Sequence, residues 1–420
     1  MAYSPRLTDI LLKEELEAFG AVLLIGPKFC GKTTTASQIA KSIRFMQDPN
    51  EQDTYLQIAE LTPSVLLEGE NPLLIDEWQM APQLWDAVRH SVDLRGEFGL
   101  YILTGSVTVD ETKIKHSGIG RISRLRMYTM SLFESNDSNG TVSIAQLFEN
   151  PGTALSARSS LRVEDYAHLI VRGGWPNMVG LHEKVVARQI AGYCDLLTKS
   201  EIMTVDSVTR DPRKVELFLR SFARHTATQA SKATILEDMK HIDKNIHINT
   251  LQSYFTAFEN LFIIDNLPAW SPRLRSKTTI RFADTLHFTD PAIAAHLLKA
   301  FPRDLLFDPH TFGLLFESLV VRDLRIYAQA LRGHVSHYRD RNGLEADAII
   351  HLPTGEWAAI EVKLSLYHVD EAAENLLALK DKIDTDHMHS PAFLMIVTAS
   401  EYAYRRNDGV YVVPLGCLRP

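Results

Sequence analysis

Cysteine is scarce in this sequence, with three residues, Cys30, Cys194 and Cys417, in a chain of 420. Their positions show no paired spacing, which argues against a disulfide framework and a cysteine-based zinc site. No apolar run approaches the roughly 18 residues that a membrane span needs. The first 20 residues carry charges where an export signal would be apolar, and they favour an amphipathic helix. These absences predict a cytoplasmic protein without a membrane segment.

Positive charge is also in short supply, because 44 lysines and arginines face 52 acidic residues and leave a net charge of -8. This balance argues against a dedicated, wholly basic nucleic-acid binder, although it leaves room for a local basic patch. A hydrophobic content of 45% and a charged content of 23% are typical of a soluble globular protein. The length is too great for one ordinary core and predicts two or three domains.

The first functional pattern is a glycine-rich loop between an apolar run and a helical pattern. Residues 21–25 (AVLLI) read as a buried strand, and residues 32–45 have helical spacing. The loop GPKFCGKT matches G-x-x-x-x-G-K-[ST], whose backbone N–H groups, lysine and hydroxyl bind phosphates and Mg²⁺. The nucleotide-binding residues that this motif predicts are Gly26, Pro27, Lys28, Phe29, Cys30, Gly31, Lys32, Thr33 and Thr34.

Two further apolar runs end in polar residues that suit the same chemistry. Asp76 and Glu77 follow the run at 73–75, so we expect Asp76 to join Thr33 in holding Mg²⁺ and Glu77 to orient the attacking water. Thr104 and Ser106, at the end of a third run, are candidate γ-phosphate sensors, with turn capping as the alternative. No N-K-x-D motif occurs, so ATP is the expected nucleotide.

Arg121 lies in the stretch GIGRISRLR at 118–126 and is a candidate arginine finger. Such a residue reaches the nucleotide of a neighbouring subunit and raises turnover by about 10³–10⁵. The alternative is that Arg121 belongs to a solvated basic edge together with Arg124 and Arg126. Both interpretations stay open at the level of sequence.

The middle of the chain predicts helices and a β-ribbon. Residues 214–227, 233–242 and 249–261 read as three helices, and 262–270 and 279–288 would pair as a wing. This winged-helix pattern usually places its last helix in the major groove, yet 249–261 contains no Lys or Arg to hold phosphates. The alternative is a structural spacer. The candidate DNA contacts lie in the wing: Arg273, Arg275, Lys277 and Arg281.

Near the end of the chain, two strands predict a hairpin with an unusual charge pattern. Residues 344–352 and 358–365 flank the turn Pro353-Thr354-Gly355, a favoured three-residue connection. Centring the register on Thr354 places Asp347 opposite Glu361. Directly opposed like charges destabilise a strand pair unless a cation lies between them. Two carboxylates at this spacing suit Mg²⁺ or Mn²⁺.

A third carboxylate, Glu317, lies in the apolar stripe of a predicted helix at 313–331. A carboxylate in such a stripe needs a partner, and metal coordination would provide one. Lys363 would then position the attacking water or stabilise charge in the transition state. The alternative pairs Lys363 with Glu345 as a cross-strand ion pair and leaves Glu317 with local hydrogen bonds.

These motifs together resemble a family of bacterial and archaeal ATPases with a nuclease-like C-terminal domain. The glycine loop, Asp76-Glu77, LTGS and the GR at 120–121 resemble AAA-type ATPases, and Glu317, Asp347 and Glu361-Val-Lys363 resemble the PD-(D/E)XK nuclease motif. The resemblance implies an α/β multidomain protein: a P-loop NTPase with a parallel sheet and a helical lid, a winged helix, and a restriction-endonuclease-like α/β domain. It leaves nuclease activity open.

The expected boundaries are 1–158 for the ATPase core, 159–206 for the lid, 207–290 for the winged helix and 291–420 for the nuclease-like domain. The predicted function is a Mg²⁺-dependent ATPase that acts on DNA, including branched or structured DNA, as a ring-type homo-oligomer. The alternative is a nucleotide-controlled scaffold or regulator whose nuclease-like domain is an inactive binding module.

Overall fold

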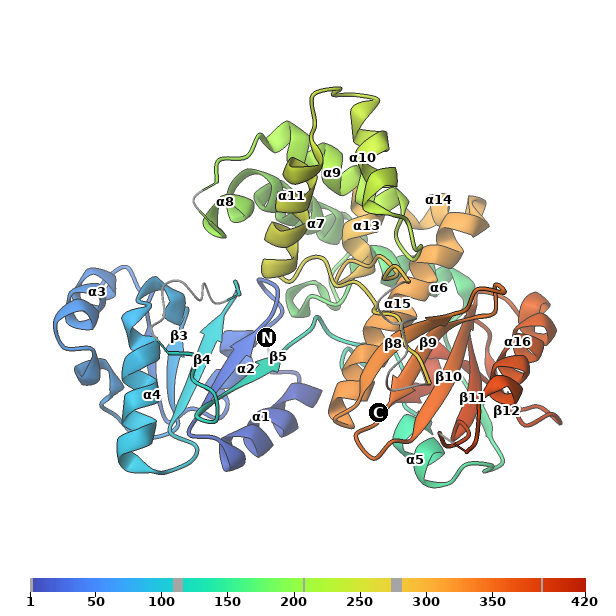
Figure 1. The fold of residues 1–420 in the computed structure, drawn as a ribbon, viewed down its shortest axis with the longest axis horizontal. Helices are drawn as coiled ribbons and strands as arrows, with labels where there is room; N and C mark the ends of the chain where they lie inside the picture. Colours follow the sequence, from blue (N-terminus) through green and yellow to red (C-terminus); the bar gives the residue numbers. More distant parts are fainter. Residues whose placement is uncertain (1–2, 109–115, 207, 273–281, 387) are drawn as a thin grey trace. The chain divides into compact units, whose positions relative to one another are not determined.

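The computed structural model of the chain describes residues 3–108, 116–206, 208–272, 282–386 and 388–420 (Figure 1). The chain divides into two compact units. Unit 1 comprises Met1–Thr129 and Asn260–Phe262, and unit 2 comprises Met130–Glu259 and Ile263–Pro420. Within the described ranges, no helix has the length and apolarity to cross a membrane.

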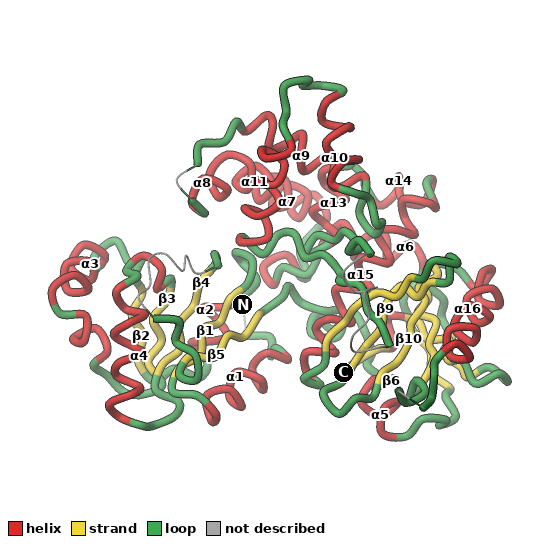
Figure 2. The backbone as a smooth tube through the Cα atoms, viewed as in Figure 1, coloured by secondary structure: helices red, strands yellow, loops and turns green. Residues whose placement is uncertain are grey.

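Unit 1 is built on a five-stranded parallel sheet with the order β2-β3-β4-β1-β5 (Figure 2). The central strands β1 and β4 are almost completely buried, as expected for a parallel sheet covered on both faces. The order places β4 between β1 and β3, so the carboxyl ends of these three strands meet at one edge. The strands are β1 (Ala21–Ile25), β2 (Ser42–Phe45), β3 (Leu73–Asp76), β4 (Tyr101–Gly105) and β5 (Ile122–Arg126).

Two apolar clusters cover the faces of this sheet. One includes Trp78, Trp85 and Val88, and the other includes Leu12 and Met127. The amphipathic N-terminal helix predicted from the sequence is confirmed as α1. The helices of unit 1 are α1 (Leu7–Ala18), α2 (Lys32–Ser37), α3 (Gln52–Leu61), η1 (Pro63–Leu67), η2 (Trp78–Met80) and α4 (Gln83–Arg95).

The helix predicted at 32–45 is wrong in its second half. The helix α2 ends at Ser37, and Ser42–Phe45 forms the edge strand β2. Lys41 N donates a hydrogen bond to Pro72 O (2.9 Å), and β2 then pairs with β3. A short apolar pattern is compatible with either a helix or a strand, so this tertiary pairing decides the outcome.

Unit 2 contains a seven-stranded mixed sheet with the order β7-β12-β13-β11-β10-β9-β8. The long helix α15 packs on β8, β9 and β10, while α16 packs on β9, β10 and β11 from the other side in Figure 1. A second, two-stranded sheet pairs β6 with β14. The strands are β6 (Val142–Ser143), β7 (Ser156–Arg158), β8 (His334–Arg339), β9 (Glu345–His351), β10 (Trp357–Lys363), β11 (Phe393–Thr398), β12 (Tyr402–Arg405), β13 (Tyr411–Pro414) and β14 (Leu418–Arg419).

The three helices predicted in the middle of the chain are confirmed as α9, α10 and α11. Where the structure describes the expected β-ribbon, it has isolated antiparallel bridges, Ile264 to Phe288 and Leu267 to Thr285. The winged helix stays a prediction. The helices of unit 2 are α5 (Ile144–Glu149), α6 (Val163–Arg172), η3 (Pro176–Met178), α7 (Glu183–Leu196), η4 (Leu197–Glu201), α8 (Ile202–Thr204), α9 (Pro212–Arg224), α10 (Lys232–Lys240), α11 (Ile248–Asn260), α13 (Pro291–Leu297), α14 (Pro302–Phe307), α15 (Pro309–Ala330), η5 (Leu366–His368), α16 (Val369–Lys382) and η6 (Leu415–Cys417).

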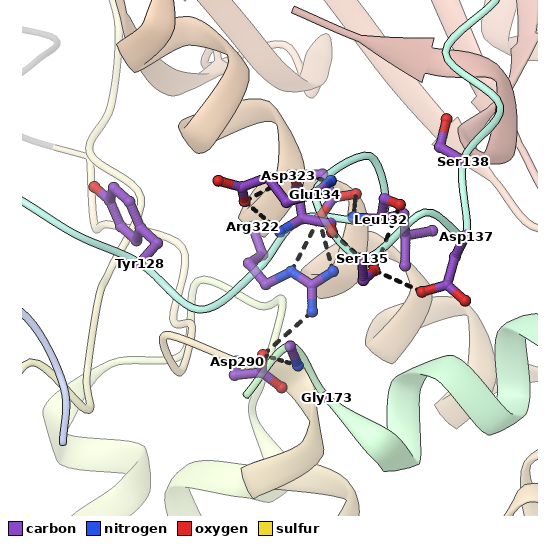
Figure 3. A network of polar contacts seen from close by, with 12 residues as sticks. Tyr128, Leu132, Glu134, Ser135, Asp137, Ser138, Gly173, Asp290, Arg322 and Asp323 are labelled. Carbon is purple, nitrogen blue, oxygen red and sulfur yellow. Dashed lines mark hydrogen bonds and ion pairs between the residues drawn. The ribbon is translucent and has the colours of Figure 1, made fainter. Parts of the chain in front are cut away.

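A buried ionic network fixes the beginning of unit 2 (Figure 3). Arg322 of α15 pairs with Asp323 (2.7 Å) and with Asp290 (3.2 Å), the residue that caps α13. Asp323 Oδ2 accepts a hydrogen bond from Leu132 N (2.9 Å), and Asp290 Oδ2 accepts one from Gly174 N (2.9 Å). Four segments that are distant in the sequence therefore meet at one charged centre.

Strand pairing holds the residues after Thr129 in unit 2. The sequence predicts an ATPase core up to residue 158, whereas the first compact unit ends at Thr129. The residues that follow are held inside unit 2, because β6 pairs with β14 and β7 pairs with β12. The four-domain division itself stays a prediction.

Candidate functional site

The glycine-rich loop joins β1 to α2 with a backbone that side chains rarely adopt. Gly26 has a φ of 154° and Gly31 a φ of 106°. A Cβ atom on Gly26 would lie 2.1 Å from Met127 O, so only glycine fits there. Phe29 adopts a φ of 64° and the residue is 58% exposed. These positive φ angles curve the loop at the N-terminal end of α2, where backbone N–H groups can face a phosphate.

Lys32 folds back over this loop. Its Nζ donates hydrogen bonds to Gly26 O (2.9 Å) and Pro27 O (3.0 Å), and the residue is 6% exposed. The ammonium is thus held above the loop by neutral carbonyl groups. Hydrogen bonds between charged groups are stronger than those to neutral acceptors, so phosphate oxygens would compete for this amine effectively.

Two hydroxyl groups converge on one oxygen of Asp76. Thr33 Oγ1, at the start of α2, donates to Asp76 Oδ1 (2.6 Å), and Thr104 Oγ1, on β4, donates to the same atom (2.7 Å). The strand order brings these three residues together, because β4 lies between β1 and β3. Hydroxyl and carboxylate oxygens are ligands that Mg²⁺ prefers, so this group fits the ion.

Glu77 lies beside this group in a left-handed backbone conformation, with a φ of 55°. Its N–H donates to Thr104 Oγ1 (3.1 Å). Its Oε2 accepts hydrogen bonds from Ser106 Oγ (3.2 Å) and from Gln79 Nε2. The carboxylate is therefore positioned by two donors. Of the two predicted sensor residues, Thr104 contacts the carboxylate of Asp76 and Ser106 contacts that of Glu77.

Two supporting residues escaped the sequence analysis. Gln79 donates a hydrogen bond to Glu77. Its position two residues after Asp76-Glu77 is the feature of the sequence that could have identified it. Arg6, which is 4% exposed, donates to Cys30 O (2.8 Å) in the loop and to Tyr128 O (2.9 Å). No local pattern links the N-terminus to a loop that lies 24 residues away, so only the fold reveals Arg6 as a support of the loop.

Arg121 has its partner on α4. Its Nε donates to Asp93 Oδ1 (2.7 Å), and Nη1 donates to Ile119 O (3.1 Å). The guanidinium holds the pKa of the Asp93 carboxyl below its usual range, with Arg89 as a second, weaker positive neighbour. The Arg121 side chain is 48% exposed. An exposed ion pair of this kind is weak, which leaves Arg121 free to exchange Asp93 for another anion.

In unit 2, the predicted hairpin has the expected register. Trp357 pairs with His351 and Ile360 with Ala348, around a turn in which Gly355 has a φ of 92°. The regular ladder ends at that second pair. Beyond it, Asp347 Oδ2 accepts a hydrogen bond from Val362 N (2.7 Å) in place of a backbone carbonyl. The end of the ladder directs the Asp347 side chain to the same region as Glu361 and Lys363.

Lys363 bridges two of the carboxylates. Its Nζ lies 2.6 Å from Glu361 Oε2 and 3.9 Å from Asp347 Oδ2. The alternative pairing of Lys363 with Glu345 is wrong, because Glu345 lies 3.6 Å from Arg339 instead. Glu361 is 1% exposed, and its Oε1 has no hydrogen-bond partner among the described residues. This buried oxygen is available to a cation.

The electrostatics of this group favour a bound cation. Burial, followed by the negative charge of Asp347, raises the pKa of Glu361 to about 8. The same two causes raise the pKa of Glu317 well above its usual value, and burial raises that of Asp347. Burial alone would lower the pKa of Lys363, but Asp347 and Glu361 together raise it. One amine does not neutralise three carboxyl groups.

Glu317, Asp347 and Lys363 line one cavity of about 460 Å³ in unit 2, with Glu361 buried behind it. The structure thus brings the four predicted residues into one region. Among the described residues, however, no three His, Cys, Asp or Glu side chains are arranged as a ready metal site. The four predicted DNA contacts, Arg273, Arg275, Lys277 and Arg281, lie outside the described residues.

Three known protein families match separate stretches of the chain. Residues 18–136 match a family described as an AAA domain. Residues 163–304 and 312–418 match two families described as domains of unknown function, DUF8612 and DUF4143. A search of curated protein sequences gives no match. Residues 18–136, which contain the glycine-rich loop and Asp76, are therefore similar to AAA domains.

Two solved structures are similar to the chain at low identity. The Walker-type ATPase of Pyrococcus abyssi is 14% identical with a TM-score of 0.42, over 69% of this chain and 94% of that one. The replication initiator DnaA, bound to AMPPCP and single-stranded DNA, is 14% identical with a TM-score of 0.28, over 62% of this chain and 89% of that one.

Proposed function

We propose that the chain is a Mg²⁺-dependent ATPase that acts on DNA as a ring-type homo-oligomer and carries a metal-dependent, nuclease-like C-terminal domain. The observation that carries the ATPase proposal is the convergence of Thr33 and Thr104 on Asp76 beside the glycine-rich loop. This arrangement places a cation-binding carboxylate next to the phosphate-binding backbone. ATP binding would arrange the subunits around their partner, and hydrolysis would reset them.

Each residue of the ATP site has a separate task. The residues Gly26–Thr34 surround the phosphates, and Lys32 turns from its loop carbonyls to the outer phosphates. Thr33 and Asp76 would hold Mg²⁺, which neutralises phosphate charge when bound. Glu77 accepts a hydrogen bond from the attacking water and orients it, while Ser106 and Gln79 fix the carboxylate. Thr104 links Asp76 to the Glu77 backbone, which suits a sensor of the γ-phosphate.

The test of this proposal is the variant Lys32→Ala. We expect loss of fluorescent ATP-analogue binding and of phosphate release, because the variant removes the phosphate-facing charge. The matched control is Lys41→Ala, since Lys41 is exposed and lies outside the loop. Turnover by Lys32→Ala at the control rate would refute the role of the loop.

We propose that Glu317, Asp347 and Glu361 hold Mg²⁺ or Mn²⁺ and that Lys363 stabilises charge at the scissile phosphate. The unpartnered Glu361 Oε1 and the raised pKa values of the three carboxyl groups support this assignment. A bound divalent ion would activate water or polarise the phosphate. Lys363 would release Glu361 to the ion and move toward the phosphate oxygens.

A second candidate function is a nucleotide-controlled scaffold or regulator with an inactive binding module. The 2.6 Å ion pair between Lys363 and Glu361 favours it, because this pair gives Glu361 Oε2 a charged partner without a metal. The two candidates differ in their response to Mn²⁺. Cleavage of plasmid or branched DNA that requires Mn²⁺ and is lost in Asp347→Asn supports the nuclease. Intact DNA, with a melting temperature indifferent to Mg²⁺ and Mn²⁺, supports the scaffold.

DNA contact is assigned to the predicted wing rather than to α11. The helix α11 (Ile248–Asn260) carries no Lys or Arg, so it lacks the charge that holds phosphates during base reading. We infer that DNA is recognised by its backbone. Affinity should therefore vary little with sequence and should fall steeply with added salt.

A further inference from the structure

The cavity around the carboxylate group is composite. Its first side comes from α15, β9 and β10, which carry Glu317, Asp347 and Lys363. We call the rest of its lining the second side: residues 227–229, Thr285, and β8, the strand that pairs with β9. The second side draws on both matched segments, because 227–229 and Thr285 fall within residues 163–304, whereas β8 falls within residues 312–418 together with Glu317, Asp347 and Lys363. The C-terminal residues 312–418 do not complete this cavity by themselves.

The second side is fixed by backbone hydrogen bonds. Ala227 N donates to Leu286 O (2.7 Å), and Leu286 N donates to Thr228 O (2.9 Å). His337 N of β8 donates to Pro268 O (2.9 Å), and its Nε2 lies 3.1 Å from Ala283 O. A wall built in this way holds its side chains in place without help from a ligand.

The two sides carry opposite chemistry. The first presents carboxylates, whereas the second presents the amide of Gln229 and the guanidinium of Arg339. Arg339 Nη1 donates to Gln229 Oε1 at 3.4 Å and lies 3.6 Å from Glu345, and its side chain is 44% exposed. These are long contacts, so Arg339 can exchange them for a stronger acceptor.

We propose that this second side binds the phosphodiester backbone of a single nucleic-acid strand, with Arg339 and Gln229 as its phosphate contacts. The inference rests on the nuclease proposal, because the strand would lie with its phosphate between these donors and the metal-binding carboxylates. A guanidinium suits phosphate by its planar, forked geometry. The chemistry is shared by DNA and RNA.

The size of the cavity determines the single-strand assignment. A volume of about 460 Å³ is in the range that encloses one drug-sized ligand, which is also the scale of one nucleotide with its phosphate. A duplex is far larger, since its major groove alone is about 12 Å wide. The aromatic ring nearest to this wall, Tyr338, is 6% exposed and packs on Trp270, so it offers no open face to a base. Binding should therefore tolerate any sequence.

The experiment measures binding apart from cleavage. Fluorescein-labelled single-stranded DNA and RNA of about 12 nucleotides, and a blunt duplex of the same length, are titrated with the full-length protein in Ca²⁺ and increasing salt. We expect tighter binding of the single strands. Arg339→Ala should weaken that binding by roughly tenfold. It should also reduce the slope of log affinity against log salt by about 0.7, the value for one phosphate of a single strand.

Two variants serve as controls. Arg339→Lys keeps the charge and should keep the salt slope, while losing affinity because the fork is absent. Arg341→Ala removes a nearby exposed cation that does not line the cavity, and should leave both quantities unchanged. Equal binding of duplex and single strand, or equal effects of Arg339→Ala and Arg341→Ala, would overturn the inference.

The failure of this inference and the failure of the nuclease proposal are distinguishable. Strand binding that depends on Arg339, without cleavage in Mn²⁺, would leave the inference standing and remove the nuclease. Cleavage that requires Asp347 but shows no preference for single strands would support the nuclease and overturn the inference. A preference for DNA over RNA, or the opposite, identifies which polymer supplies the phosphate.

Discussion

Glu77 occupies a backbone conformation that is costly for a residue with a side chain. Its φ of 55° directly after β3 costs about 1–3 kcal/mol and persists only where the surroundings impose it. The contacts to Thr104, Ser106 and Gln79 impose it here. Backbone strain of this kind is common at functional sites, where a side chain must keep one orientation. The backbone conformation of Glu77 turns its carboxylate toward the region beside the glycine-rich loop.

The variant Glu77→Gln tests this role. We expect ATP binding to persist, because binding does not require the carboxylate, and hydrolysis to fall by about 10²–10⁴. Binding is measured by fluorescence with an ATP analogue and hydrolysis by phosphate release. Glu60→Gln, on the exposed face of α3, is the matched control. Normal hydrolysis by Glu77→Gln would assign the water to another residue.

The buried carboxyl of Glu361 makes stability depend on pH. Its folded-state pKa is about 8, whereas an ordinary glutamate titrates near about 4.3. The folded protein thus binds this proton more tightly than the unfolded chain. The associated stability is complete below pH about 4.3 and is lost as the pH rises through about 8.

In chelator, we expect the melting temperature of the wild type to fall between pH 5 and pH 8 by more than that of Glu361→Gln, which cannot ionise there. Added Mn²⁺ should raise the wild-type value most at pH 8, since a ligand that binds only the folded state stabilises it. Glu374→Gln, exposed on α16, should behave as the wild type. Parallel curves for the wild type and Glu361→Gln would show that Glu361 does not carry this proton.

At the scale of elements, the ionic network at Arg322 joins α13, α15, the turn at Gly174 and the segment at Leu132 (Figure 3). Arg322 is 2% exposed, and both of its partners are 0% exposed. A buried charge that loses its partner remains uncompensated, so such networks are costly to break. The network therefore fixes how these elements pack within unit 2.

Asp323→Asn should lower the free energy of unfolding of unit 2 by about 3 kcal/mol, because Arg322 loses in the interior the negative charge of the carboxylate whose Oδ1 accepts from both Nε and Nη2. Urea denaturation followed by circular dichroism measures the change. Asp381→Asn is the control, since Asp381 is exposed on α16. A change below about 1 kcal/mol, the range of a surface pair, would mean that Asp290 alone satisfies Arg322.

At the scale of the whole molecule, the two proposed chemistries lie in different compact units. The ATP site is contained in unit 1 and the carboxylate group in unit 2. The chain passes between the units after Thr129 and again on both sides of Asn260–Phe262. A residue that completes the ATP site of a neighbouring subunit would not contact the ATP site of its own subunit. Arg121, which pairs with Asp93, is the candidate for this role.

Arg121→Ala should keep nucleotide affinity and assembly and should reduce turnover by about 10³ or more if the residue completes a neighbour's site. Mixing it with Glu77→Gln subunits should restore activity, because each supplies what the other lacks. Arg124→Ala, a neighbouring exposed cation, is the control. An unchanged rate in pure Arg121→Ala would assign Arg121 to its surface pair with Asp93.

The sequence by itself determined the elements whose signals are local. The apolar runs that end at Ile25, Asp76 and Gly105 are strands, and the hairpin around Thr354 has the register that its turn predicts. Continuous burial and turn chemistry depend on neighbouring residues, so they can be read along the chain.

The tertiary structure alone decided the features that depend on distant partners. It made β2 a strand, placed residues 130–158 in unit 2, paired Lys363 with Glu361 rather than Glu345, and brought Gln229 into the lining of the same cavity as Asp347. The pairing of Lys363 with Glu361 follows from the end of the β9–β10 ladder at Ile360. The other outcomes rest on contacts between segments far apart in the chain. Periodicity does not encode such contacts, because it reports which face of an element is buried and not what covers that face.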